Sequence, residues 1–311
     1  MVNFDIPDIK KDLPMSMTMA AFSGIAWYTA IELNLRFFHL FKRRKGIYFW
    51  SCVVCSWGIL LHPLAILLAD FQVIADTRIG IPLIYITWWI MTLSFSVVMW
   101  SRLHLIMPNS KYLRWVLYMM IFTTVFISIP SMVIGPMSQQ PTPSGKRLVP
   151  FYNIWGKIEN ATWPLQESII SCLYIWYTHK NMRVSSRAHE SLTSNSNSNA
   201  SSSLPSAPSE YSASTYSKRF TQLMHHLIAT NVMIIVLDAV LLGIVYAEMW
   251  YLQGNMKPAV YGIKLRIEFS ILNRLVTLTQ AGRNPVGSAP APQPSFITKS
   301  PVATHSRSER V

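Results

Sequence analysis

Charged residues are scarce in this chain of 311 residues. Asp, Glu, Lys and Arg make up 13% of it, whereas soluble domains carry about 25%. Hydrophobic residues make up 51%, and the mean hydropathy is +0.28. Because the apolar residues are also gathered into long windows, the composition excludes an ordinary soluble domain. It predicts an all-α fold, a polytopic membrane protein.

Acidic residues are scarcer than basic ones, with 14 Asp and Glu against 27 Lys and Arg, a formal net charge of +13. In a soluble chain such an excess would indicate nucleic-acid binding. Here the Lys and Arg residues lie mainly in short connections between apolar windows, which is the pattern that orients a protein in a membrane. We therefore expect the lipid bilayer as a partner and no nucleic acid.

Cysteine is rare, and all three cysteines lie inside apolar windows. Cys52 and Cys55 have the spacing of a zinc ligand pair, but without a second pair we expect them to be apolar packing residues. Cys172 stands alone in another window. The sequence therefore predicts no extracellular disulfide, no metal site and no cofactor.

Seven apolar windows are long enough, at about 20 residues, to span a hydrocarbon core. We expect a seven-helix transmembrane domain over residues 17–280, after an extracellular segment 1–16 that has no cleavable signal peptide. The connection 179–220, rich in serine, and the tail 281–311, rich in proline, are too polar to bury a core, so we expect disorder in both. The windows are Met17 to His39, Ile47 to Leu68, Ile79 to Trp100, Tyr112 to Ile134, Ala161 to Tyr177, Leu223 to Tyr246 and Pro258 to Thr279.

The basic residues of the connections predict an orientation. On one side 17 Lys and Arg lie in or beside the connections, against 7 on the other, and the richer side is cytoplasmic. The N-terminus is then outside and the C-terminus inside. The sequon at Asn160 lies outside, although it abuts the fifth window, and the sequon at Asn199 lies inside and should stay unmodified. We expect a cytosolic partner to bind the connection 179–220 and the tail, with serine phosphorylation there as a hypothesis.

An outer loop is predicted from Gly135 to Glu159, between the fourth and fifth windows. Its prolines break a helical pattern, and it carries Phe151, Tyr152 and Trp155. We expect this aromatic group at the level of the lipid headgroups, the usual place for such side chains. A lid over a ligand cavity is the alternative.

Two polar groups in the first windows have ordinary explanations. Glu32 and Arg36 are spaced i,i+4 on a helix, so we expect them to neutralise each other. His62, beside Pro63 in the second window, is expected to be hydrogen-bonded within the helix packing rather than to act as a ligand.

The seventh window is the most unusual, because it is apolar yet carries several charges. A lone strand cannot cross a bilayer, so the segment must be helical if it is embedded. Wound as a helix, it gathers Arg266, Asn273 and Arg274 into a polar stripe and predicts a separate i,i+4 pair of Lys264 with Glu268.

Charged residues in the last three windows form our candidate ligand site. Each would cost about 2.5 to 3.5 kcal/mol at the membrane centre, so these residues must pair, lose their charge or line water. One interpretation is an outward-opening polar cavity among the last three windows, and the other is a buried ion-pair network that fixes helix packing. The candidate residues are Glu167, Asp238, Lys264, Arg266, Glu268 and Asn273.

Five segments resemble a family of uncharacterised integral membrane proteins of filamentous fungi, a domain of unknown function. The resemblance implies seven spans and carries no settled activity, so no functional residue follows from it. The segments are R-K-G-I-Y-F-W from Arg44, S-W-G-I-L-L-H-P from Ser56, S-R-L-H-L-I from Ser101, Q-E-S-I-I from Gln166 with L-Y-I-W-Y-T from Leu173, and K-L-R-I-E-F-S-I-L-N-R from Lys264.

Three functions stay open, of which a receptor-like or sensing protein comes first. It departs from rhodopsin-like receptors, since Ser101, Arg102 and Leu103 stand where an acidic, Arg, aromatic triplet would end the third helix. A small-molecule or ion transporter is the second alternative. A membrane-embedded hydrolase is the third, although no H-x-x-x-H pair provides zinc ligands. We predict no catalytic residue.

Overall fold

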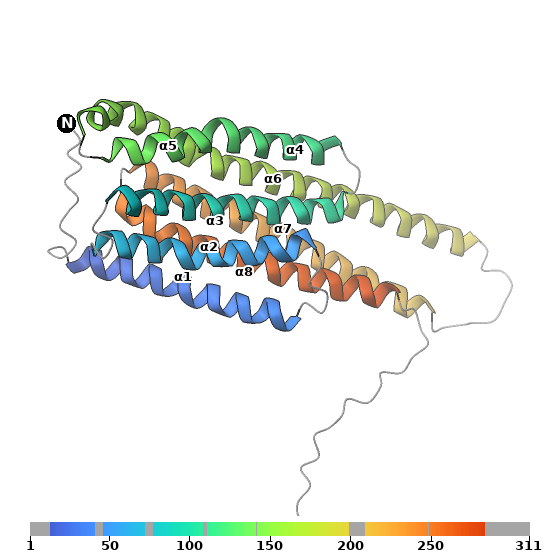
Figure 1. Cartoon of the computed structure of the whole chain (residues 1–311). Helices are drawn as coiled ribbons and strands as arrows, with labels where there is room; N and C mark the ends of the chain where they lie inside the picture. Colours follow the sequence, from blue (N-terminus) through green and yellow to red (C-terminus); the bar gives the residue numbers. More distant parts are fainter. Residues whose placement is uncertain are drawn as a thin grey trace, which may run out of the picture.

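Long and roughly parallel helices make up the described structure (Figure 1). The computed structural model describes residues 13–40, 46–71, 77–107, 111–140, 142–198, 209–247 and 249–283, and every regular element in them is a helix, as the sequence predicts. The elements are α1 (Leu13–Leu40), α2 (Ile47–Asp70), α3 (Thr77–Ile106), α4 (Lys111–Phe122), η1 (Thr123–Ser128), α5 (Ile129–Ser138), α6 (Pro143–Ser198), α7 (Ser209–Tyr246) and α8 (Trp250–Arg283).

Several helices suggest a membrane protein. Within the described residues four are long and apolar enough to cross a bilayer, and only 22% and 28% of the last two are buried in the bundle. Their apolar side chains therefore face outward, as Phe126 and Val236 do. Exposed apolar surface of this extent is unfavourable in water and favourable against lipid. The four are Ile47–Asp70, Arg78–His104, Lys111–Ser138 and Met224–Tyr246.

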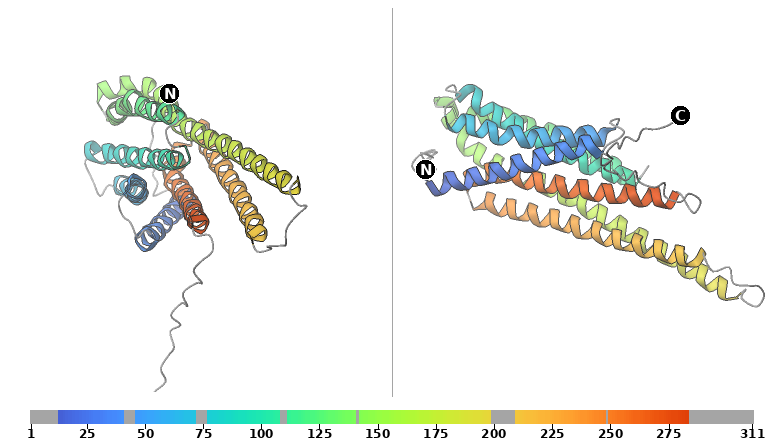
Figure 2. Two further views of the ribbon diagram at one scale, coloured as in Figure 1. Left: turned by 90° about the vertical axis from the view of Figure 1, so that its right-hand side faces the viewer. Right: turned by 90° about the horizontal axis from the view of Figure 1, so that it is seen from below.

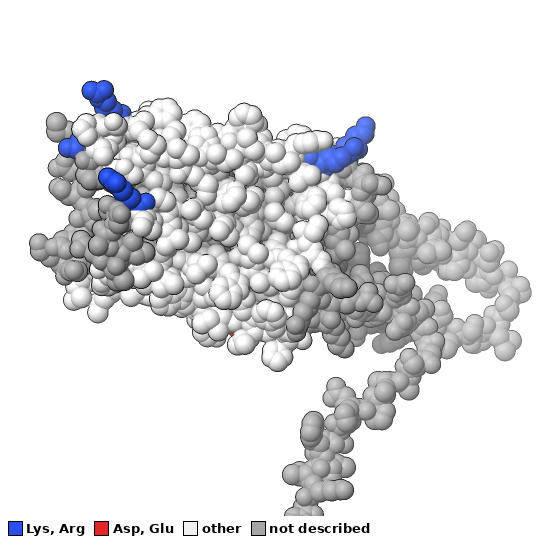
Figure 3. All heavy atoms as spheres, in the orientation of Figure 1, with Lys and Arg blue, Asp and Glu red and all other residues white. Residues whose placement is uncertain are grey.

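The charged side chains are also distributed as in a membrane protein. On the face drawn in Figure 3, the Lys and Arg side chains of the described residues lie at the two ends of the bundle, and the band between them is almost uncharged. Such a band is what the hydrocarbon region of a bilayer requires, because a lipid-facing charge there is costly.

Small residues let the helices pack closely. The left view of Figure 2 shows the bundle nearly end-on, and its most extensive contacts are α2 with α3, α6 with α7 and α1 with α8. A Cβ added at Gly58 of α2 would lie 3.0 Å from the Cα of Met91 on α3, and one at Gly262 of α8 would lie 2.5 Å from Oγ1 of Thr29 on α1. Close backbone approach of this kind is how helices associate where lipid removes the hydrophobic drive.

The fourth window contains a π-helix, η1, between α4 and α5. Pro130 follows it in the first turn of α5. Proline has no N–H to donate, and its ring clashes with the carbonyl four residues earlier. A local widening of the helix to π geometry relieves that clash. The chain therefore stays helical across this window in spite of its proline.

The predicted outer loop from Gly135 to Glu159 is wrong. Helix α5 continues to Ser138 and α6 begins at Pro143, so only a short connection separates them. The Thr142 Oγ1 atom accepts a hydrogen bond from the N–H of Gly145 at 3.1 Å, and proline is favoured in the first helical position after such a cap. The prolines that predicted a loop thus include the one that starts the helix.

The helices also run into the segment predicted to be disordered. Helix α6 ends at Ser198 and α7 begins at Ser209, so much of 179–220 is helical. A helix that is already nucleated gains one hydrogen bond for each residue that it adds, which explains its spread into a polar sequence. The ends of α6 and α7 project beyond the rest of the bundle (Figures 1 and 2). Residues 199–208 and most of the tail, 284–311, lie outside the described residues.

Candidate functional site

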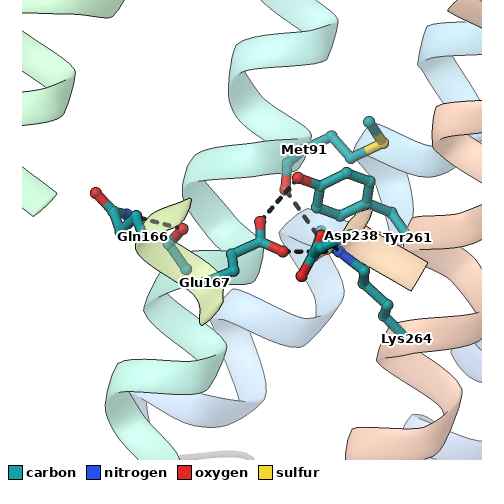
Figure 4. Close-up of polar contacts among 8 residues, drawn as sticks. Met91, Gln166, Glu167, Asp238, Tyr261 and Lys264 are labelled. Carbon is teal, nitrogen blue, oxygen red and sulfur yellow. Dashed lines mark hydrogen bonds and ion pairs between the residues drawn. The ribbon is translucent and has the colours of Figure 1, made fainter. Parts of the chain in front are cut away.

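A buried lysine joins three helices inside the bundle. The Lys264 Nζ atom, on α8, donates to Oε2 of Glu167 on α6 at 2.8 Å and to Oδ1 of Asp238 on α7. Tyr261 Oη donates to the other oxygen of Glu167 at 2.8 Å. Figure 4 shows both carboxylates turned toward the amine of Lys264. The Lys264 and Glu167 side chains are 0% exposed, so this polar cluster is shielded from solvent.

A second buried ion pair lies one helical turn away on α8. Glu268 pairs with Arg102 of α3, and both are buried. The Arg102 Nη2 atom also donates to Oδ1 of Asn231 on α7 at 2.7 Å, and its guanidinium lies 4.1 Å from the ring centroid of Tyr174 on α6. The planar guanidinium suits this combination of carboxylate, amide and aromatic face.

The two pairs together contain three carboxylates and two cations, which is one formal negative charge. Removing such charges from water is expensive, and the cost is offset only where each has a partner and further hydrogen bonds. Oδ2 of Asp238 and both oxygens of Glu268 lack a hydrogen-bond partner within the described residues, although Glu268 has its ion pair. The cluster can therefore take up a proton or another cation.

Four of the six candidate residues meet in these pairs, but with other partners than predicted. Lys264 and Glu268 do not pair with each other, because each is drawn to a residue on another helix. Arg266 lies apart, 43% exposed, with Nη1 3.1 Å from Oε2 of Glu32 on α1. The side chain of Asn273 lies outside the described residues.

Sequence reasoning missed Arg102 and Tyr261. Arg102 was counted among the basic residues of a connection, since it follows an apolar window closely. A signal for Tyr261 was present, because the polar positions of α8 at 253, 257, 261, 264 and 268 recur at spacings of three and four. That period places them on one face of the helix.

A cavity of about 190 Å³ lies at the end of the bundle where α3, α6 and α8 begin and α2 ends. Asn160 and Lys257 line it, each seven residues before a member of the first ion pair on the same helix. Seven residues are two turns, so the cavity and the pairs share one face of α6 and of α8. Polar side chains thus follow this face of α8 through the apolar core, from the cavity to Glu268.

Hydrogen bonds tie the cavity wall together. Oδ1 of Asn160 accepts from Nε2 of Gln253 at 3.0 Å and from Nζ of Lys257. The hydroxyl groups of Tyr85 and Tyr152 lie 2.6 Å apart. Tyr152 thus packs in the cavity wall, a position that agrees with the alternative interpretation, a cover for a cavity.

Two simpler predictions are confirmed. Nδ1 of His62 lies 3.1 Å from Oγ1 of Thr87, so this buried histidine is hydrogen-bonded within the packing, and it also lines the cavity. Glu32 and Arg36 form their i,i+4 ion pair at 2.5 Å.

The packing predicted for Cys52 and Cys55 is confirmed. Cys52 and Cys55 are buried free thiols, whereas Cys172 is exposed. Among the described residues no group of three or more His, Cys, Asp and Glu is placed to hold a metal ion.

Comparison with protein families gives a match over most of the chain. A family model described as "Domain of unknown function (DUF7703)" matches residues 9–202 and 210–286. None of the curated proteins matches the chain, and none of the solved structures does.

Proposed function

We propose a function from the buried charges, since the chain belongs to the DUF7703 family, whose model matches most of its length and whose description states no activity. The protein is a receptor-like membrane sensor with seven spans, its N-terminus outside and its C-terminus in the cytosol. The distribution of Lys and Arg supports this orientation. The resemblance to proteins of filamentous fungi supports a fungal origin.

One observation carries the proposal. The helices that supply Glu167 and Asp238 to Lys264 are the two that project beyond the bundle, at the end away from the cavity. Helix α6 runs on to Ser198, and α7 starts at Ser209. About 30 residues of helix, or about 45 Å, separate each carboxylate from the projecting end. A small change at the ion pairs is therefore carried a long way.

These ion pairs suit a switch because Lys264 can be paired with both carboxylates or with only one of them, which are two distinct states. When Lys264 releases one carboxylate, the helix that carries it is free to tilt, and a rigid helix converts a small tilt into a large movement at its far end. We propose that a ligand at the cavity shifts this equilibrium, and that a cytosolic partner binds the projecting ends of α6 and α7.

Spin labels test the proposal. With Cys172 replaced by serine, labels are attached at Ser194→Cys and Ser212→Cys, and the buried Cys52 and Cys55 stay unlabelled. We expect the neutral variant Glu167→Gln/Asp238→Asn/Lys264→Met to change the distance distribution between the labels. The matched control is Glu32→Gln, which removes the half-exposed ion pairs of Glu32 with Arg36 and Arg266 and leaves the buried pairs intact. An unchanged distribution in the neutral variant, in folded protein, would show that the pairs only fix packing.

A transporter is the second candidate, and the formal negative charge of the buried pairs favours it. A cluster that takes up a proton or cation between two ends of a bundle is what a carrier needs. Reconstituted vesicles distinguish the candidates: a carrier moves protons or small amines down a gradient, and a sensor moves neither.

A further inference from the structure

We infer that the end cavity binds a small zwitterion, a molecule with a primary ammonium group and an acidic group, as in a free amino acid. The inference deepens the proposed function and rests on it for its purpose, since it names the class of ligand that is sensed. Binding itself is measurable without any signalling response.

Glu159 supplies the site for the ammonium group. It lines the cavity from α6 and is 1% exposed, and its Oε1 atom has no hydrogen-bond partner in the part of the chain that the structure describes. A carboxylate this deeply buried is unfavourable without a compensating donor. Lys257 of the same cavity already supplies some opposite charge, and a ligand ammonium adds the missing donor.

Two donors face the same cavity and suit an acidic group. Lys257 uses one N–H on Asn160, and an ammonium has three, so it retains donors for a ligand. Its Nζ lies 4.9 Å from the ring centroid of Trp88. The indole Nε1 of Trp88, also buried, has no hydrogen-bond partner within the described residues.

Both kinds of unsatisfied group line one cavity, and this selects a zwitterion over a simple amine or a simple acid. An amine alone would leave the donors of Trp88 and Lys257 unused, and an acid alone would be repelled by Glu159. Leaving buried polar groups unpaired is what makes a hydrogen-bonding site reject an incomplete ligand.

The size and access of the cavity fit a small molecule. Its volume is about 190 Å³, whereas one water needs about 10–15 Å³ on the same measure. The rings of Tyr85 and Tyr152 form part of the wall, and the exposed Gln139, which donates to Tyr85 Oη at 2.8 Å, lies at its rim. A ligand therefore enters from the end of the bundle that we assign to the outside.

Two sources provide this chemistry: a free amino acid, or the phosphoethanolamine headgroup of a lipid. In the first experiment, free amino acids are titrated by calorimetry into the full-length protein in phosphatidylcholine nanodiscs, whose quaternary headgroup has no N–H to donate. In the second, no amino acid is added. The protein in nanodiscs that contain phosphatidylethanolamine is compared with the protein in phosphatidylcholine nanodiscs, by thermal unfolding and tryptophan fluorescence. We expect binding in one of them, with Kd below about 1 mM for a soluble ligand.

Variants locate the site. Glu159→Gln should weaken binding at least about tenfold, because truncating one partner of a buried charged contact costs more than one decade of affinity. Trp88→Phe keeps the ring, removes only the N–H and should also weaken binding. The control is Lys146→Met, an exposed cation in the first turns of α6 at the same end.

Absence of binding in both kinds of nanodisc, or unchanged affinity in Glu159→Gln, would overturn the inference. Equal affinity for ethylamine and the amino acids would show that the acidic group of the ligand is not recognised, and would overturn the inference of a zwitterion. Binding that leaves the distance between the labels on α6 and α7 unchanged would sink the proposed sensor but keep the site. If the neutral variant changes the distance between the labels but no ligand binds, the sensor would stand and the site would be overturned.

Discussion

Replacing Lys264 by methionine should be among the most damaging single changes in the protein. The substitution keeps most of the side-chain volume and removes the cation shared by Glu167 and Asp238. Breaking a buried ion pair by removing one partner costs about 3–5 kcal/mol, because the other charge stays buried without compensation. Two carboxylates lose their partner here, so we expect the upper part of that range. The whole stability of a domain is about 5–15 kcal/mol.

Reversible unfolding in mixed detergent micelles, followed by tryptophan fluorescence, measures the loss. The matched control is Arg266→Met, two residues away on the same helix, where the cation is 43% exposed and paired to Glu32. An exposed pair contributes only about 0–1 kcal/mol. Adding Glu167→Gln and Asp238→Asn to Lys264→Met should recover most of the stability, since a neutral cluster has no uncompensated charge.

Two results would refute this reasoning. Equal losses in Lys264→Met and Arg266→Met would mean that burial does not strengthen the inner pairs. A triple variant no more stable than Lys264→Met would mean that lost packing, rather than stranded charge, causes the damage.

Three further predictions concern other helices and the topology. Arg102→Lys should cost about 1.5–3 kcal/mol in the same unfolding measurement, because an ammonium cannot reproduce the planar set of contacts that the guanidinium makes. Gly58→Ala should cost about 1–3 kcal/mol through overpacking, whereas Gly243→Ala, which meets open space, should be neutral or stabilising by up to about 1 kcal/mol. A reporter fused after Val311 should appear in the cytosol, and Asn199 should carry no sugar.

Each of these has a contrary outcome. An Arg102→Lys variant as stable as the wild type would show that the guanidinium acts only as a point charge. Equal effects at the two glycines would remove the argument for close approach of α2 and α3. Sugar on Asn199, or an exoplasmic reporter, would invert the proposed orientation.

Much of the fold follows from the sequence because long apolar windows depend only on local composition. The windows at 47–68, 79–100, 112–134 and 223–246 coincide with the four apolar helices. The error lies where local signals compete. Proline at 143 indicated a loop, although after Thr142 it starts a helix.

Four of the six residues singled out in the sequence come together, but not in the predicted pairs. Charge inside an apolar window is costly wherever it lies, so Glu167, Asp238, Lys264 and Glu268 stood out from the sequence alone. Which of them pair depends on how each helix is rotated about its axis, and that is set by packing far away in the sequence. Local spacing favoured an i,i+4 pair of Lys264 with Glu268, but in the structure Lys264 pairs with Glu167 and Glu268 pairs with Arg102, both on other helices.

Helix α8 is where the cavity and the ion pairs converge. Lys257, Lys264 and Glu268 lie on one face of it, facing in turn the cavity, the carboxylates of α6 and α7, and Arg102 of α3. A rotation of α8 about its axis would therefore disturb both ion pairs together, because α8 carries a charged member of each. A ligand that engages Lys257 acts on the helix that carries a charged member of both ion pairs, so an effect at the cavity need not travel through a chain of side chains to reach the projecting ends.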